Sequence, residues 1–138
     1  MTRIFQTSEE MIILDLFMEL YPDFPKGRII KEESPDFIIK INTKRSIGIE
    51  ITRLQLDPDE PPVHGIKELI EKIIQRKDDK LHIYQRKKID RYWLILVNGV
   101  SDDNAYHIPE KVYDWNLETR FNKLFIFDMP ARRIYEIK

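Results

Sequence analysis

Two acidic residues lie in isoleucine-rich, strand-like segments on either side of a short polar turn. Asp36 opens the segment 36–42, and Glu50 lies in the segment 46–52. The turn 42–45 is centred near Thr43, midway between the two acids. Directly opposed residues of an antiparallel pair point to the same face, with side chains about 5 Å apart. The sequence therefore predicts two adjacent carboxylates on one face of a β-hairpin.

The chemistry that such a pair could perform is metal binding. Two neighbouring carboxylates repel each other, and the pKa of one should rise unless a cation lies between them. Oxygen ligands and a narrow gap suit Mg²⁺ or Mn²⁺. A register shift of one residue would put the acids on opposite faces and remove the site. A structural role stays open, in which Asp36 caps a turn after Pro35 and Glu50 pairs with a nearby lysine.

The elements that must position these acids follow from hydrophobic spacing and turn residues. Their order predicts an α/β fold, a mixed central β-sheet flanked by helices, in a single domain that spans residues 1–138. Helices are expected at 8–21, 63–86 and 109–119, and strands at 28–31, 36–42, 46–52, 91–97, 123–128 and 133–137.

The acids also belong to a longer pattern. Ser34-Pro-Asp-Phe-Ile-Ile, a short turn and then Ile47-Gly-Ile-Glu-Ile-Thr52 resemble the core signature of the PD-(D/E)XK nuclease superfamily. In that superfamily a Pro-Asp opens one hairpin strand, and an acid, any residue and a lysine follow on the next. The resemblance covers roughly residues 8–97. It implies a restriction-endonuclease-like fold and a metal-dependent endonuclease or exonuclease that hydrolyses nucleic-acid phosphodiester bonds.

One position departs from the superfamily pattern, because Thr52 stands where the strand lysine is expected. Some members supply that lysine from the following helix, so the resemblance points to Lys77 or Lys80 as the catalytic lysine beside Asp36 and Glu50. Such a lysine would stabilise charge on an attacking water and in the transition state. The alternative for either lysine is that its ammonium group extends to solvent.

The resemblance also implies a set of metal ligands. Asp36 and Glu50 would hold Mg²⁺ or Mn²⁺, and the main-chain carbonyl of Ile51 would complete the shell. Superfamily members often carry one more acid on the first helix, and Glu10 is the favoured candidate.

Composition limits the other classes of function. The chain has no cysteine, which excludes disulfides and thiolate metal sites, and its three histidines form no zinc motif. No apolar run is long enough for a membrane helix and no signal-peptide region is visible, so we expect a cytoplasmic protein without a membrane partner.

The charge distribution bears on the partner. The net charge is −1, but the segment 76–91 holds seven basic residues against three acidic ones. We expect this segment to follow a phosphate backbone, with DNA favoured over RNA. A homodimer or a partner protein that supplies DNA binding stays open. So does a catalytically inactive nucleic-acid-binding or protein-interaction module on the same fold, because fold alone does not fix function.

Overall fold

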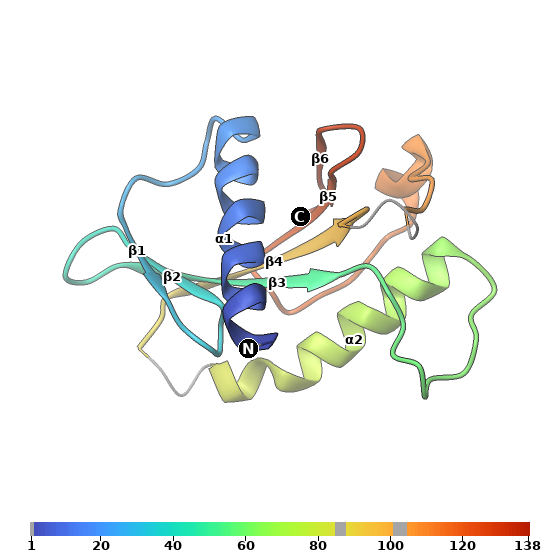
Figure 1. Cartoon of the computed structure of the whole chain (residues 1–138), viewed down its shortest axis with the longest axis horizontal. Helices are drawn as coiled ribbons and strands as arrows, with labels where there is room; N and C mark the ends of the chain where they lie inside the picture. Colours follow the sequence, from blue (N-terminus) through green and yellow to red (C-terminus); the bar gives the residue numbers. More distant parts are fainter. Residues whose placement is uncertain (1, 85–87, 101–104) are drawn as a thin grey trace.

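One mixed β-sheet organises the chain (Figure 1). The fold is taken from a computed structural model in which residues 2–84, 88–100 and 105–138 are described. The sheet has six strands in chain order: β1 (Arg28–Lys31), β2 (Phe37–Lys40), β3 (Ser46–Arg53), β4 (Arg91–Asn98), β5 (Lys123–Asp128) and β6 (Arg133–Glu136). Strands β3, β4 and β5 are parallel neighbours, and the other adjacent pairs are antiparallel. The predicted α/β class with a mixed sheet is confirmed.

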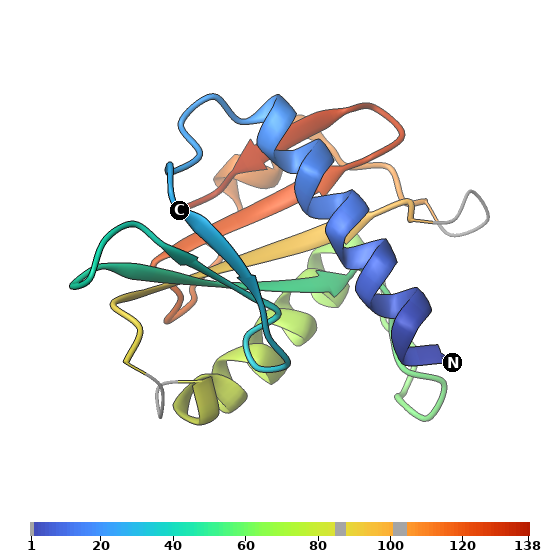
Figure 2. The same ribbon diagram turned by 60° about the vertical axis from the view of Figure 1, so that its left-hand side comes forward.

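Two helices cover the opposite faces of this sheet (Figures 1 and 2). Helix α2 (Ile66–Tyr84) connects the parallel strands β3 and β4, as a parallel crossover requires. Its buried residues pack with alternate residues of β4, including Leu94 and Leu96. Helix α1 (Thr2–Leu20) packs on the other face, where its Phe17 contacts the rings of Phe125 and Phe127.

The central strands are apolar on both sides because each side has its own hydrophobic core. In β4, every residue from Tyr92 to Asn98 is buried. Side chains of successive strand residues point to opposite faces, so Trp93 and Ile95 join the core under α1 while Leu94 joins the core under α2. The isoleucine-rich pattern of β2 and β3 has the same origin.

Three predicted helices differ from those observed. Helix α1 starts at Thr2 rather than Ser8, since residues 2–7 contain neither proline nor glycine to interrupt it. Helix α2 starts at Ile66 rather than Val63, and the end predicted at residue 86 lies outside the described residues.

The predicted helix 109–119 is wrong. A short 3₁₀ helix, η2 (Glu110–Asp114), is present instead. Asn116 adopts a positive φ of 53°, a left-handed conformation that ends the helical path. Within the described part of the chain, no helix is long and apolar enough to cross a bilayer.

Candidate active site

The β2–β3 hairpin has the register that the sequence predicts. Phe37 pairs with Ile49, Ile38 with Gly48, and the same alignment places Asp36 opposite Glu50 one step before β2 begins. Glu50 is aligned with Leu94 of β4, a residue of the core under α2. The acid pair therefore lies on the α2 face of the sheet.

Both carboxyl groups are buried, with 9% of Asp36 and 5% of Glu50 exposed. Oδ2 of Asp36 accepts a hydrogen bond of 2.7 Å from the main-chain N–H of Ile51. Burial, the negative charge of Glu50 and a hydrogen bond between the two carboxyl groups together raise the pKa of Asp36 to about 9. The N–H of Ile51 opposes this rise. At neutral pH the buried pair therefore retains a proton unless a cation replaces it.

Helix α2 supplies two groups to the same oxygen atom of Glu50. Nζ of Lys77 lies 3.2 Å from Oε2, and the Tyr84 hydroxyl donates a hydrogen bond to that oxygen. The main-chain carbonyl of Tyr84 accepts a hydrogen bond of 2.8 Å from the hydroxyl of Tyr92, which ties the end of α2 to β4. Burial and the charge of Glu50 raise the pKa of Tyr84, so its hydroxyl is a donor.

Of the two lysines predicted for catalysis, Lys77 contacts the acid pair and Lys80 is exposed. The helical repeat explains the difference. Tyr84 follows Lys77 by seven residues, about two turns, and so lies above it on one face. Lys80 follows by three residues, which rotates its side chain by about 60° away from that face.

Glu10, the acid predicted on the first helix, lies near the pair but is engaged elsewhere. Its carboxylate forms an ion pair of 2.8 Å with Lys31. The Lys31 ammonium also donates to the main-chain carbonyls of Glu32 and Asp36, at 2.6 and 3.1 Å. The negative charge of Glu10 adds to the rise in the pKa of Asp36. Lys31 therefore braces the turn before β2 and pairs with the carboxylate of Glu10.

The carbonyl of Ile51 points to the side where Asp36 lies, because the N–H and C=O of one strand residue share an edge. Continuing the register would place Pro35 opposite Ile51, and proline has no N–H to donate to that carbonyl. Among residues 2–84, 88–100 and 105–138, no three or more His, Cys, Asp or Glu side chains gather as a metal site would need. A cation here would thus have two carboxylates and one carbonyl as protein ligands.

This donor set fits a small, hard cation. Oε2 of Glu50 is occupied by Lys77 and Tyr84, and Oδ2 of Asp36 by the N–H of Ile51. Each carboxylate therefore has one oxygen left, which suits the few protein ligands and several waters of octahedral Mg²⁺ or Mn²⁺. Ca²⁺ takes about six to eight oxygens and often uses both oxygens of a carboxylate.

Some of the cations in the basic segment 76–91 are already paired with acidic side chains. Arg76 forms ion pairs with Asp57 and Glu60, and Lys77 faces the acid pair. The exposed cations that remain in its described part are Lys80, Lys88 and Arg91, while Arg86 and Lys87 lie outside the described residues. The prediction that this segment follows a phosphate backbone stays a prediction.

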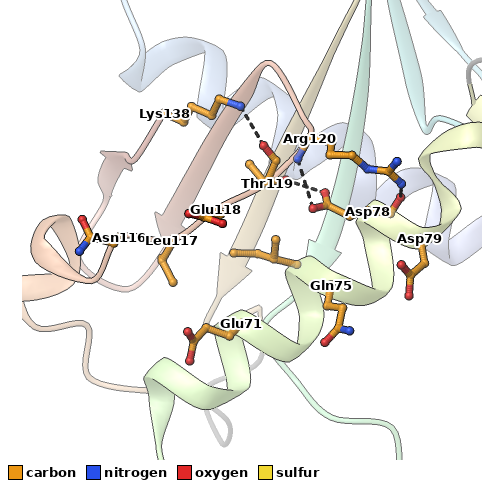
Figure 3. A pocket seen from close by; sticks show the side chains of 11 residues that line it. Glu71, Gln75, Asp78, Asp79, Asn116, Leu117, Glu118, Thr119, Arg120 and Lys138 are labelled. Carbon is orange, nitrogen blue, oxygen red and sulfur yellow. Dashed lines mark hydrogen bonds between the residues drawn. The ribbon is translucent and has the colours of Figure 1, made fainter.

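A groove of about 1010 Å³ lies between α2 and residues 116–120 (Figure 3). Asp78 fastens its walls, since its carboxylate accepts from the Thr119 hydroxyl at 2.6 Å and from the main-chain N–H of Arg120 at 3.2 Å. Because Asp78 of one wall is hydrogen-bonded to Thr119 and Arg120 of the other, we assign the groove a structural role.

Tyr84 is the site residue that the sequence did not reveal. Its apolar ring completes the hydrophobic stripe of α2, so it was interpreted as core, and it is in fact 4% exposed. The spacing of seven residues from Lys77 was the available signal, because it places the hydroxyl on the same helix face.

Comparisons with family models, with curated proteins and with solved structures gave no match. Function is therefore inferred from the chemistry of the site.

Proposed function

We propose that the protein is a Mg²⁺- or Mn²⁺-dependent, nuclease-like phosphodiesterase that acts on nucleic acid. The observation that carries the proposal is the contact of Lys77 with Glu50, which is itself hydrogen-bonded to Asp36. Two carboxylates for a divalent cation and one ammonium beside them are the groups that metal-assisted phosphodiester hydrolysis needs.

The arrangement of elements supports a restriction-endonuclease-like fold as part of the proposal. Helix α1 is followed by the antiparallel strands β1, β2 and β3, then by α2 and the parallel strand β4. This is the order of the common core of the PD-(D/E)XK superfamily that the motif resembles. Lys77 would take the place of the strand lysine that Thr52 replaces.

Each residue of the site would have a distinct part in the reaction. Asp36, Glu50 and the carbonyl of Ile51 would hold the cation, which when bound would polarise the scissile phosphate and favour ionisation of a water molecule. Lys77 would donate hydrogen bonds to the negative charge that develops as the water attacks. Tyr84 and Lys77 together would fix Glu50 so that its second oxygen faces the cation.

The test compares matched lysines on one helix. Plasmid and single-stranded DNA are incubated with the protein and Mg²⁺ or Mn²⁺, and cleavage is followed on gels. Lys77→Met and Glu50→Gln should each lower the rate on the order of 100-fold, because each removes a charged group from the reacting centre. Lys67→Met, on the same helix but exposed, should cleave as the wild type does.

Two outcomes reject the proposal. One is cleavage that persists in Glu50→Gln prepared in the same way, which would identify a contaminating nuclease. The other is an equal effect of Lys77→Met and Lys67→Met, which would remove the special role of Lys77.

A second candidate function is supported by Thr52, the residue at the strand-lysine position. A domain that lost catalysis together with this lysine would bind nucleic acid without turnover. It would show salt-sensitive binding of DNA and no product in any of the cleavage reactions.

A further inference from the structure

A cavity of about 280 Å³ lies at the end of β3, where that strand extends past β2 and where Ile51 follows Glu50. Strand β2 pairs with β3 only as far as Ile49. In the described part of the chain, the last residues of β3 therefore have no paired strand at the edge that β2 occupies further back. Helix α1, the end of β3 and helix α2 line the cavity, through Glu9 and Glu10, Ile51 and Arg53, and Arg76. Ile51 thus lines this cavity and also donates its main-chain N–H to the carboxylate of Asp36.

We infer that this cavity binds a phosphate group of the substrate and that Arg53 and Arg76 are the residues that recognise it. The inference rests on the proposed function, because it names where the substrate of the acid pair binds. Guanidinium groups bind phosphate through two parallel hydrogen bonds, which makes arginine the preferred residue for this purpose.

The two arginines are held at the cavity by carboxylates. Arg76 pairs with Asp57, at 3.0 Å, and with Glu60, both in the loop between β3 and α2. Arg53 pairs with Glu9 of α1. A carboxylate presents oxygens to a guanidinium group much as a phosphate does. These acids therefore occupy the positions that phosphate oxygens would take.

Two of these ion pairs, Arg53 with Glu9 and Arg76 with Asp57, are open to solvent, whereas the side chains of the Arg76–Glu60 pair are 27% and 21% exposed. The side chain of Asp57 is 69% exposed and that of Arg53 is 48% exposed, and pairs with that much solvent access contribute little to stability. Glu60 is part of the proline-rich loop 57–62, which also carries Asp57. A phosphate at Arg76 would displace the loop carboxylates without disturbing the buried core.

Charge makes phosphate binding dependent on the metal. Arg53 and Arg76 face three acids at the cavity, Glu9, Glu10 and Asp57, with the acid pair next to them. A divalent cation between Asp36 and Glu50 would offset this negative field and raise the affinity for an anion. Nucleic acid should therefore bind more tightly with Mn²⁺ than with EDTA.

Arg76 also connects the cavity with a path for the rest of the strand. It lines a second hollow of about 360 Å³ together with Lys72 and Lys80. These three cations are spaced four residues apart on α2 and so lie in a row about 6 Å apart. The next phosphates of a bound strand would follow this row.

The first test measures binding of a short, fluorescein-labelled single-stranded DNA by fluorescence anisotropy in Mn²⁺. Phosphorothioate linkages keep the probe intact, which a gel checks after each titration. Arg53→Gln and Arg76→Gln should each weaken binding roughly tenfold and lower the salt slope by about one. Arg133→Gln breaks an ion pair between β6 and Glu110 of η2, neither of which lines the cavity. This variant should change neither the affinity nor the salt slope. Wild-type affinity and salt slope in both test variants would overturn the inference.

The second test changes affinity in the opposite direction. Asp57→Asn combined with Glu60→Gln frees Arg76 from its carboxylates, so binding of the same probe should tighten by roughly tenfold. A purely structural role of these ion pairs predicts a lower melting temperature and no gain in affinity. Unchanged or weaker binding in a variant that melts as a folded protein would therefore reject the assignment.

The cleavage assay separates this inference from the proposed function. Binding that depends on Arg53 and Arg76, together with no cleavage of unmodified DNA by the wild type, would retain the cavity and reject hydrolysis. Cleavage by the wild type that persists unchanged in both arginine variants, with unchanged binding, would retain hydrolysis and reject the cavity.

Discussion

A proton shared by Asp36 and Glu50 is the alternative to a cation at the acid pair. Burial and the charge of Glu50 raise the pKa of Asp36 from 3.8 to about 9. Between these values the folded protein holds a proton that the unfolded chain has released. The contribution of this group to stability is therefore fully present below about pH 4 and is lost as the pH rises to about 9. Metal affinity should rise over the same range, because the cation must displace the proton.

Asp36→Asn tests this balance. Asparagine keeps an oxygen that can accept from the N–H of Ile51 but has no proton to lose. Without metal, the melting temperature of the wild type should fall between about pH 5 and pH 9 by more than that of the variant. Mn²⁺ at pH 8 should raise the melting temperature of the wild type alone.

Asp59→Asn is the control, since Asp59 is exposed and should behave as the wild type in both measurements. Equal pH dependence of Asp36→Asn and the wild type would show that the acid pair is not what makes stability depend on pH.

Single residues of the site were predictable to different degrees. One short turn was enough to predict that Asp36 and Glu50 face each other. The turn fixes the register of the two strands, and side chains along a strand alternate between the two faces with a period of two. The sequence could not choose between Lys77 and Lys80, since the choice depends on how α2 is rotated on the sheet. The bracing of Glu10 by Lys31 was also hidden, because it depends on contacts between α1 and β1.

The β2–β3 hairpin depends on the absence of a side chain at Gly48. A Cβ atom there would lie 2.8 Å from Cγ of Pro35 and 3.2 Å from Cδ1 of Tyr92. Pro35 directly precedes Asp36, so the glycine lets the loop that carries the acid approach β3. A glycine is thus needed at position 48 because a side chain there would push Pro35 and the carboxylate of Asp36 away, and not because the backbone has a positive φ.

Gly48→Ala should therefore destabilise the fold by roughly 1–3 kcal/mol through overpacking and should also weaken metal binding, because Pro35 must shift. Chemical denaturation and titration with Mn²⁺ measure the two effects. Gly65→Ala is the matched control, since a Cβ atom at Gly65 meets nothing within 4 Å. A Gly48→Ala variant as stable as Gly65→Ala would contradict the close approach.

Strands were better predicted than helix ends. The strands 28–31 and 123–128 were located to the residue, because Gly, Pro and Asn bound short apolar runs. The helix expected at 109–119 failed because its spacing suits a helix while Asn116 takes a left-handed conformation. The left-handed conformation of Asn116 depends on the path by which the chain returns to β5, and hydrophobic spacing does not reveal this path.

Two hydrophobic cores on opposite faces of the sheet hold the molecule together. Phe17 of α1 is fully buried in one of them, against Phe125 and Phe127. Lys77 and Tyr84 reach the acid pair from the other face. The core under α1 therefore supports the sheet from the face opposite to Lys77 and Tyr84.

Phe17→Ala should lower the free energy of unfolding by about 3–5 kcal/mol, the range for removal of a buried phenylalanine side chain. Urea denaturation measures the loss. Ile12→Ala on the same helix should change stability little, because Ile12 is 58% exposed. Similar losses in the two variants would mean that α1 does not pack on the sheet as described.

The groups proposed to act on phosphate, from Asp36 to Tyr84, all come from one continuous stretch of chain that holds β2, β3 and α2. Strands β5 and β6 supply packing partners and none of these groups. Mutational drift in the C-terminal third is thus constrained by packing and by structural contacts such as those of Thr119 and Arg120 with Asp78, and not by the chemistry of the site. Homologues could diverge there beyond recognition while the stretch 36–84 keeps its spacing, and a search for distant relatives gains most by weighting that stretch.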